Sequence, residues 1–394
     1  MKSKLILGTA ALLPCFSNAA GFQLNAQSAS GLGRAFAGDA VIADSAAIVA
    51  KNSAAMAYIE QPTVSVGAIY IDSGVDVTNI SYTSGSAPTE SLSDQSLSAG
   101  TLVPSLHYVH PITDSKFTLG ATVHSNFGTN VEFDDSFEAS EFGGKTALSS
   151  VNVGVALAYE VTEHINIGAG LDVIYGEGQI SREAILDIDA DGFGLGANVG
   201  ATYQLNDNNR FGISYRYSPD IEVEGEISQV SVPADKMNVP LPDTLEFSGW
   251  HRLSQKFAMH YSLQWVNWSE FDSLTSPSYD DTIKDYKWKD AGHISVGGTY
   301  DMSKDFVLRA GYMYDLSPTD ELTSLSIPDV NRHWFTIGST YHITESSSVD
   351  VGLGFIVGES AEVDESLTVV SPSNISANVT ADAVLLGVQY QHRF

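Results

Sequence analysis

Most of the chain alternates between apolar and polar positions with a period of two. In Val151–Tyr159 the odd-numbered positions are Val, Leu or Tyr, whereas the even-numbered ones are Asn, Gly or Ala. The same alternation recurs in Phe211–Tyr217, Met259–Trp265 and Leu308–Tyr314. A two-residue period gives a β-strand one apolar face and one small or polar face. The pattern therefore predicts an all-β protein built from amphipathic strands.

Segments of this kind fill the chain after residue 60, and short and long polar connections separate them in alternation. An antiparallel barrel with an even number of strands is typical of bacterial outer-membrane proteins. Short connections such as 206–209 and 302–305 would then face the periplasm, and long ones such as 78–100 and 362–378 the outside. We expect strands near residues 62–78, 100–112, 116–133, 147–160, 163–182, 186–204, 209–227, 243–254, 257–271, 284–301, 304–317, 331–344, 348–362 and 378–394.

A soluble β-sandwich produces the same alternation with its apolar face turned inward, so the strand ends must decide between the two. Aromatic residues stand there at Tyr159, Tyr217, Trp265 and Tyr314, as in the interfacial girdles of membrane barrels. The last strand ends in Phe394, which resembles the sorting signal read by the outer-membrane insertion machinery. We predict a 14-stranded antiparallel transmembrane β-barrel in the bacterial outer membrane, in contact with its lipid and with lipopolysaccharide.

The first residues have the pattern of an export signal. Lys2 and Lys4 precede an apolar run, Leu5–Leu13, and a small-residue cleavage site follows at Ser17–Ala19. Cys15 invites a lipoprotein reading, but the proline before it suits lipid attachment poorly. We expect residues 1–19 to be a signal peptide and the mature chain to lack cysteine. No later run of apolar residues has the length of a transmembrane helix.

Between the signal and the strands lies a segment without alternation. Of the 40 residues from Ala20 to Ile59, 13 are alanine, and Asp44 stands where the N-cap of a helix over 45–57 would be. Small side chains suit a segment that packs inside a barrel. We therefore predict an N-terminal hatch at residues 20–59, with short helices, inside a barrel formed by residues 60–394. Four larger apolar residues would seal it: Phe22, Leu24, Leu32 and Phe36.

The charge balance is strongly acidic. The formal net charge is −29, and removal of the signal leaves 17 basic against 48 acidic residues. Such a chain repels the phosphates of nucleic acid, so we exclude a nucleic-acid partner. The acidic clusters at 132–141 and 280–285 could bind Ca²⁺ or bridge to lipopolysaccharide through divalent ions, although a solvated acidic rim is the commoner outcome.

Catalytic and metal-binding patterns are missing from the sequence. The ten histidines show no metal-ligand spacing, and neither a phosphate-binding glycine loop nor a nucleophile elbow occurs. We expect no metal, no cofactor and no enzymatic activity. A membrane-embedded hydrolase would need grouped Ser and His or Asp and His residues, so it is a remote alternative. A structural or adhesin-like barrel also stays open.

The residue order in three segments resembles the FadL family of outer-membrane long-chain fatty acid transporters. The segment GFQLN–(3)–ASGLGRAFAGDAVIAD at 21–44 is similar to the family's hatch, and residues 242–271 are also family-like. Ser125–Gly128 followed by Glu132-Phe133 resembles its kinked third strand. The resemblance implies passive uptake of long-chain fatty acids through a lumenal site, hatch movement, and a lateral gap at Asn126, Phe127 and Gly128. The residues alone are also compatible with an ordinary strand glycine.

The resemblance also implies ligand-binding residues. Phe22 falls on the family's ligand-contacting aromatic residue, and Arg182, in the segment YGEGQISRE, on the arginine that meets the fatty acid carboxylate. A guanidinium grips a carboxylate through two charge-assisted hydrogen bonds. Lys289 is a candidate second cation. On the residues alone, Phe22 equally well packs against the wall, and Arg182 pairs with one of the many acids.

Two departures from the family pattern bear on the ligand. The hatch has Asn52-Ser53-Ala54 where the family usually has Asn-Pro-Ala. The connection 183–193 after Arg182 is much shorter than the loop that builds an outer capture groove in long-chain transporters. The alternative substrates are uncharged hydrophobic compounds, aromatic or aliphatic hydrocarbons, which require no cation.

Overall fold

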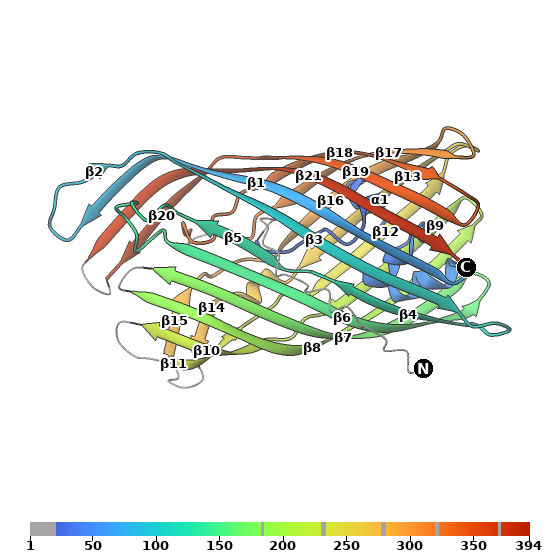
Figure 1. The fold of residues 1–394 in the computed structure, drawn as a ribbon, viewed down its shortest axis with the longest axis horizontal. Coiled ribbons are helices and arrows are strands. Elements are labelled where there is room, and N and C mark those ends of the chain that lie inside the picture. Colours follow the sequence, from blue (N-terminus) through green and yellow to red (C-terminus); the bar gives the residue numbers. More distant parts are fainter. Residues whose placement is uncertain (1–20, 183–184, 230–233, 277–280, 320–322, 369–371) are drawn as a thin grey trace, which may run out of the picture.

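A computed structural model of the chain describes residues 21–182, 185–229, 234–276, 281–319, 323–368 and 372–394. The expected signal peptide lies outside the described residues. The chain forms one closed antiparallel β-barrel of 14 strands (Figure 1), which confirms the predicted fold class. Each wall strand pairs with its neighbour in the chain, and the last closes the barrel by pairing with the first, for example at Ile69↔Gly387.

Several wall strands are divided into a lower and an upper piece, so the strand labels exceed the number of wall strands. The short β2 (Glu90–Ser91) pairs with the upper end of the first strand. In chain order the wall consists of β1 (Thr63–Ser84), β3 (Gln95–Pro111), β4 (Phe117–His124) with β5 (Gly128–Glu132), β6 (Lys145–Thr162), β7 (Ile165–Arg182), β8 (Leu186–Asn206), β9 (Asn209–Tyr217) with β10 (Ile221–Gln229), β11 (Ala234–Val239) with β12 (Thr244–Arg252), β13 (Phe257–Val266) with β14 (Ser273–Ser276), β15 (Asp281–Asp285) with β16 (Ala291–Asp301), β17 (Phe306–Leu316), β18 (Arg332–His342), β19 (Ser347–Gly358) with β20 (Ala361–Leu367), and β21 (Ser373–Arg393).

The outer face of the wall changes character along each strand, as β8 shows. Phe193 and Leu195 point outward and are 68% and 73% exposed, whereas the outward residues nearer the top are Asp187, Asp189 and Asp191. Exposed large apolar side chains belong in lipid, and exposed carboxylates belong in water. The bilayer therefore ends between Asp191 and Phe193. The upper strand ends, at the left of Figure 1 with β2, β15 and β20, stand clear of it.

Strands reach further out than the sequence analysis predicted. The predicted connection 78–100 is partly strand, because β1 continues to Ser84 and β3 begins at Gln95. The gaps left between the predicted strands 209–227, 243–254, 257–271 and 284–301 contain β11, β14 and the start of β15. β8, by contrast, begins at Leu186, as the predicted strand 186–204 does. These segments are polar mainly on their outward face. Inward residues such as Ile80 of β1 and Met237 of β11 are buried.

Residues 21–59 lie inside the barrel, in the half that holds the C-terminus (Figure 1). They contain α1 (Ala29–Leu32) and two 3₁₀ helices, η1 (Ala46–Ala50) and η2 (Ser53–Tyr58). No helix within the described ranges is long and apolar enough to cross a membrane. We propose that this segment acts as the hatch.

The prediction of one helix over 45–57 capped by Asp44 is wrong, because the segment forms two short 3₁₀ helices with other caps. Asn52 interrupts the run, and its side chain accepts a hydrogen bond from the Ala54 N–H, so it caps η2. Ser45 rather than Asp44 caps η1. Asp44 is instead engaged in ion pairs with Arg34 and Arg309. The Asn52 cap starts η2 at Ser53, the position at which the resembled family pattern Asn-Pro-Ala has its proline.

At glycines on the inner wall, the backbone of segment 21–59 lies in direct contact with the backbone of the strands. A Cβ atom at Gly311 of β17 would lie 2.2 Å from the carbonyl carbon of Arg34, and one at Gly168 of β7 would lie 2.3 Å from the Ala54 nitrogen. Neither backbone atom is the end of a flexible side chain. The hatch can therefore dock at these positions only against glycine.

Substitution Gly311→Val should push the hatch away from the wall while the barrel still assembles. Overpacking of this kind costs about 1–3 kcal/mol, which would raise the population with a displaced hatch roughly 5- to 150-fold. The matched control is Gly74→Val on β1, where the nearest atom to a Cβ is the Leu97 carbonyl oxygen at 4.0 Å. Ion conductance of single barrels in planar bilayers measures the effect. Equal conductance of the two variants would contradict tight docking.

Candidate functional site

An aromatic cluster surrounds Phe22 in the lumen. Its ring centroid lies 4.7 Å from that of Trp268, 5.0 Å from Phe271, 5.8 Å from Trp288 and 5.9 Å from Phe127. Most of these contacts are edge-to-face, the arrangement that the ring quadrupoles favour. Trp268 belongs to η3 (Trp268–Glu270), which follows β13. The structure thus places the predicted Phe22 and Phe127 together in one buried apolar cluster.

An apolar cavity opens beside this cluster. It holds about 40 Å³ of space in this structure, and Phe22 and Phe127 form one end. Its only charged lining residue is Glu177. The other large side chains come from the inner faces of β6, β7, β8, β10 and β11 and the segment after β11: Leu148, Ile180, Ile188, Ile221, Val223, Met237, Val239 and Leu241. The lining suits a hydrocarbon and offers little to a hydrated ligand, but its side chains must move apart to admit a chain.

Arg182 lies two residues beyond the cavity, at the upper end of β7. Its side chain is 4% exposed, and its Nε and Nη2 atoms have no hydrogen-bond partner in the described part of the chain. The positive charge of Arg182 acts on Lys284 and Tyr286. Tyr286 in turn packs against Phe271, with 4.8 Å between ring centroids. A buried guanidinium with two unpaired donors therefore stands at the outer end of the aromatic cluster.

Lys284 of β15 provides a second buried cation there. Its Nζ binds the Glu365 carboxylate at 2.9 Å and the Ser324 hydroxyl at 2.7 Å. The pKa of Lys284 is lowered to about 8, because burial and the nearby charge of Arg182 together outweigh the opposing effect of Glu365. The site lies above the bilayer, so Lys284 can exchange its proton with water.

The structure does not place Lys289 at this position. Lys289 is exposed, between β15 and β16, and its backbone N–H donates to the Pro318 carbonyl. The sequence analysis missed Lys284 because it lies in the acidic segment 280–285, interpreted as a solvated rim. The alternation of Lys284, Tyr286 and Trp288 on the inward face was the signal that could have found it.

The wall is interrupted at the predicted kink. β4 ends at His124 and β5 begins at Gly128, and β5 pairs with β6 alone among the described strands. β3 pairs with β4 only from Leu106 onward, so its upper part has a ladder on one side, with β1. The N-terminal segment bonds to the break from inside: the Leu24 N–H donates to the Asn126 carbonyl at 2.6 Å, and the Gly128 N–H donates to that of Phe22 at 2.8 Å.

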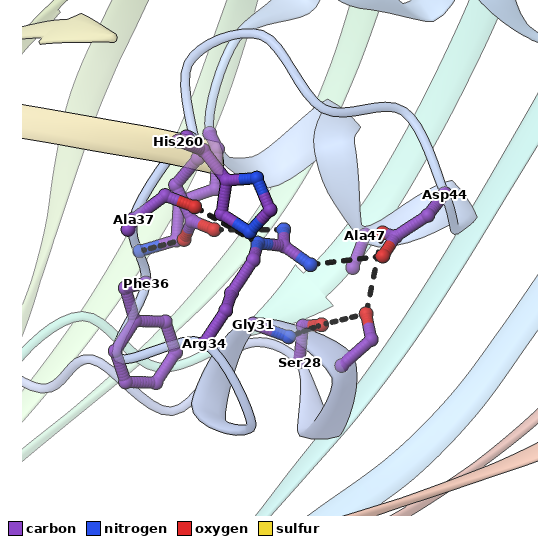
Figure 2. Close-up of polar contacts among 12 residues, drawn as sticks. Ser28, Gly31, Arg34, Phe36, Ala37, Asp44, Ala47 and His260 are labelled. Carbon is purple, nitrogen blue, oxygen red and sulfur yellow. Dashed lines mark hydrogen bonds and ion pairs between the residues drawn. The ribbon is translucent and has the colours of Figure 1, made fainter. Parts of the chain in front are cut away.

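A buried ionic network, whose Arg34–Asp44 pair is seen in Figure 2, ties the hatch to the wall. Arg34 donates from Nη1 to Asp44 at 2.8 Å and from Nη2 to Asp39 at 3.0 Å, and Lys51 pairs with Asp39 at 3.3 Å. Asp44 also accepts from Arg309 of β17, at 3.2 Å. A buried charge that loses its partner is costly. The network therefore holds the hatch in one position.

The described residues offer no evident metal site. No group of three or more His, Cys, Asp or Glu side chains among them is arranged to hold an ion.

Comparison with known proteins identifies the family. The family model described as outer membrane protein transport protein (OMPP1/FadL/TodX) matches residues 10–394. The chain belongs to this family. It is 34% identical to outer membrane protein P1 of Haemophilus influenzae, over 96% of this chain and 95% of that protein. It is 32% identical to the long-chain fatty acid transport protein of Escherichia coli K12, over 92% of this chain and 93% of that protein.

Solved structures of the OMPP1/FadL/TodX family share the fold. A FadL homologue from Pseudomonas aeruginosa superposes with a TM-score of 0.87 at 19% identity, over 95% of this chain and 100% of that one. The toluene transporter TodX of Pseudomonas putida superposes with a TM-score of 0.69 at 18% identity, over 95% and 100%. The chain is thus an outer-membrane transport barrel. Because relatives are named for fatty acids and for toluene, membership leaves the substrate open.

Loss of the Asp44 charge should loosen the hatch. In Asp44→Asn the guanidinium groups of Arg34 and Arg309 lose their shared carboxylate, and we expect a loss of roughly 3 kcal/mol in unfolding free energy. This is the low end for breaking a buried ion pair, because the Asp44 side chain is 25% exposed. Urea unfolding in detergent micelles measures it. Asp305→Asn, in an exposed turn, is the control, and equal stability of both variants would show that the network does not hold the hatch.

Proposed function

We propose that this barrel takes up long-chain fatty acids passively across the bacterial outer membrane. The observation that carries the proposal is the buried Arg182, with unpaired donors, at the end of an apolar cavity and an aromatic cluster. A buried cation without a counter-charge is unfavourable. A ligand carboxylate would supply that charge while its hydrocarbon chain fills the apolar space. We propose no catalytic step.

The proposed path keeps the hydrocarbon out of water. Each CH₂ group gains about 0.8 kcal/mol by leaving water, so a chain of apolar sites suits the ligand better than a water-filled pore. The head group would bind Arg182 and Lys284, and the chain would extend along the cavity towards Phe22. Movement of Phe22 and the hatch would then open one of two exits, sideways through the gap between β3 and β5 at Asn126–Gly128 or onward to the periplasm. Nothing in this path requires an energy source.

Uncharged hydrocarbons are the second candidate substrate class. The rings around Phe22 suit a monoaromatic ligand, and the structural relatives include toluene transporters. Such a ligand would leave the Arg182 guanidinium uncompensated. The two candidates therefore differ in their dependence on this cation.

Replacement of the two cations should weaken fatty acid binding selectively. Hydrogen bonds to charged groups contribute about 1.5–3 kcal/mol, so we expect Arg182→Gln and Lys284→Gln each to weaken oleate binding by roughly 10- to 100-fold. Isothermal titration of purified barrels with oleate and with toluene measures both ligands. Toluene binding should not change, and Lys304→Gln, in an exposed turn, should change neither.

Lys289→Gln in the same titration tests the cation chosen from the sequence. Because Lys289 is exposed, we expect a smaller effect than for Lys284→Gln. If Arg182→Gln bound oleate as tightly as the wild type, its role as head-group site would be rejected.

Oleate binding should also depend on pH. As pH rises through about 8, Lys284 loses its charge, so its contribution to carboxylate binding should fade above that pH. The variant Lys284→Gln should lack this pH dependence. The folded-state pKa lies below the ordinary 10.5, so the unfolded chain holds the proton longer and stability rises between these values. Weaker binding at pH 9 would therefore not reflect unfolding. A pH-independent affinity from 7 to 9.5 would contradict the role of Lys284.

A further inference from the structure

Two arginines flank Trp250 at the end of the lumen opposite Arg182. Arg210 lies at the beginning of β9, and Trp250 is its direct cross-strand partner on β12. Arg252 ends β12, two residues further on the same face. That face is lumenal, because Ser248 and Ser214 on it are buried while Phe247 and Ile213 are exposed. The three side chains therefore line the periplasmic mouth of the barrel.

These arginines differ from the other lumenal arginines near the hatch. Arg34, Arg216 and Arg309 each bind a carboxylate. Arg210 and Arg252 form no ion pair with any described residue, in a chain that holds 48 acidic residues against 19 basic ones. With so many acids available, two neighbouring lumenal arginines without one stand out.

Aromatic rings take the place of acids around these cations. The Arg210 guanidinium carbon lies 3.6 Å from the ring centroid of Tyr58 and 5.5 Å from that of Trp250, and the Arg252 guanidinium carbon lies 5.3 Å from that of Trp250. Arg210 Nη2 reaches Gln204 only at 3.4 Å, and its Nε is buried without a partner. A ring face orients a guanidinium but leaves its charge and edge donors available.

A cavity of about 220 Å³ below the hatch adjoins Trp250 and Arg252. Trp250 and Arg252 line it together with Ile42 of the hatch, Phe257 and Val307. Its other charged or titratable lining residues are Asp44, Asp301, Arg309, His342, Asp350 and Arg393. Asp44 and Asp350 are already paired with Arg309. The cavity thus offers apolar surface beside unpaired guanidinium donors.

We propose that Arg210 and Arg252 form a carboxylate site at the periplasmic mouth, which receives the head group of a long-chain acid that has passed the hatch. The inference rests on the proposed fatty acid transport and adds a second, exit-side subsite. Trp250 and Ile42 of the hatch contact the hydrocarbon next to the head group. Tyr58 is the last residue of η2, so its contact with Arg210 joins this subsite to the hatch.

Quenching of Trp250 by 9,10-dibromostearate tests the subsite, because bromine quenches indole fluorescence only at contact. The Trp250 signal is the difference between the wild type and Trp250→Phe. We expect dibromostearate to quench it, and Arg210→Gln/Arg252→Gln to require at least tenfold more ligand. Quenching of the remaining tryptophans, which include Trp268 and Trp288, should not change. Lys256→Gln, an exposed periplasmic lysine, is the charge-matched control, and heat-modifiable migration on gels verifies that every variant is folded.

The possible results separate the two proposals. A Trp250 signal that dibromostearate leaves unquenched, or quenches equally in the double variant, overturns the exit subsite. Displacement of dibromostearate from Trp250 by equimolar inorganic phosphate also overturns it, because the site would then be a general anion site that suits lipid phosphate. Failure of the proposed fatty acid transport would give a different result. Dibromostearate would then not quench Trp268 and Trp288, or Arg182→Gln would not change that quenching.

Discussion

Backbone hydrogen bonding in a medium without water is the constraint on which this structure depends. Every N–H and C=O group within the hydrocarbon must find a partner in the protein, and closure of β21 onto β1 provides this around the wall. The upper part of β3 is the exception, since it has no ladder with β5. The chain's own N-terminal residues, Phe22 to Leu24, bond to the backbone at this break. The same segment thus pairs with backbone groups of the break between β4 and β5, and it carries the central aromatic ring of the candidate site.

The polarity of the lumen follows from the same wall. Inward positions within the bilayer hold Gly, Ser and Asn, so backbone can approach backbone and the hatch packs through glycines such as Gly311. Above the bilayer the inward positions become apolar, as at Ile188 and Val75. The ligand cavity belongs to this upper region. On the proposed path the barrel would bind hydrocarbon where its outside faces water, whereas the ion pairs of the hatch lie where its outside faces lipid.

Local patterns predicted the fold, but long-range pairing escaped them. The period-two alternation gave the 14 strands and their lipid face, because that signal is contained in neighbouring residues. Strand ends were missed where the outward residues are polar, as at Ser96 and Ser98 of β3, since polarity alone resembles a loop. The pairing of Asp44 with Arg309 could not be predicted. The two residues lie 265 positions apart, and 48 acidic residues compete for 19 basic ones. Arg182 came from family resemblance, whereas Lys284 needed the observed register of β15.

The forces that hold the hatch rank the two ways out of the lumen. At the lateral break, two backbone hydrogen bonds join Phe22 and Leu24 to the wall, and each contributes about 0.5–1.5 kcal/mol. Below, the ion pairs of Arg34, Asp44 and Arg309 must separate before anything passes, at about 3–5 kcal/mol for one buried pair. A hydrocarbon cannot replace the negative charge of Asp44, but a ligand carboxylate can supply a negative charge to Arg309 or to Arg34. On the proposed path, lateral release is therefore the less costly route for the chain, and axial passage is reserved for a ligand that brings its own negative charge. Arg210 and Arg252 would act only on the axial route. There they would stabilise the ligand carboxylate after the hatch has closed behind it.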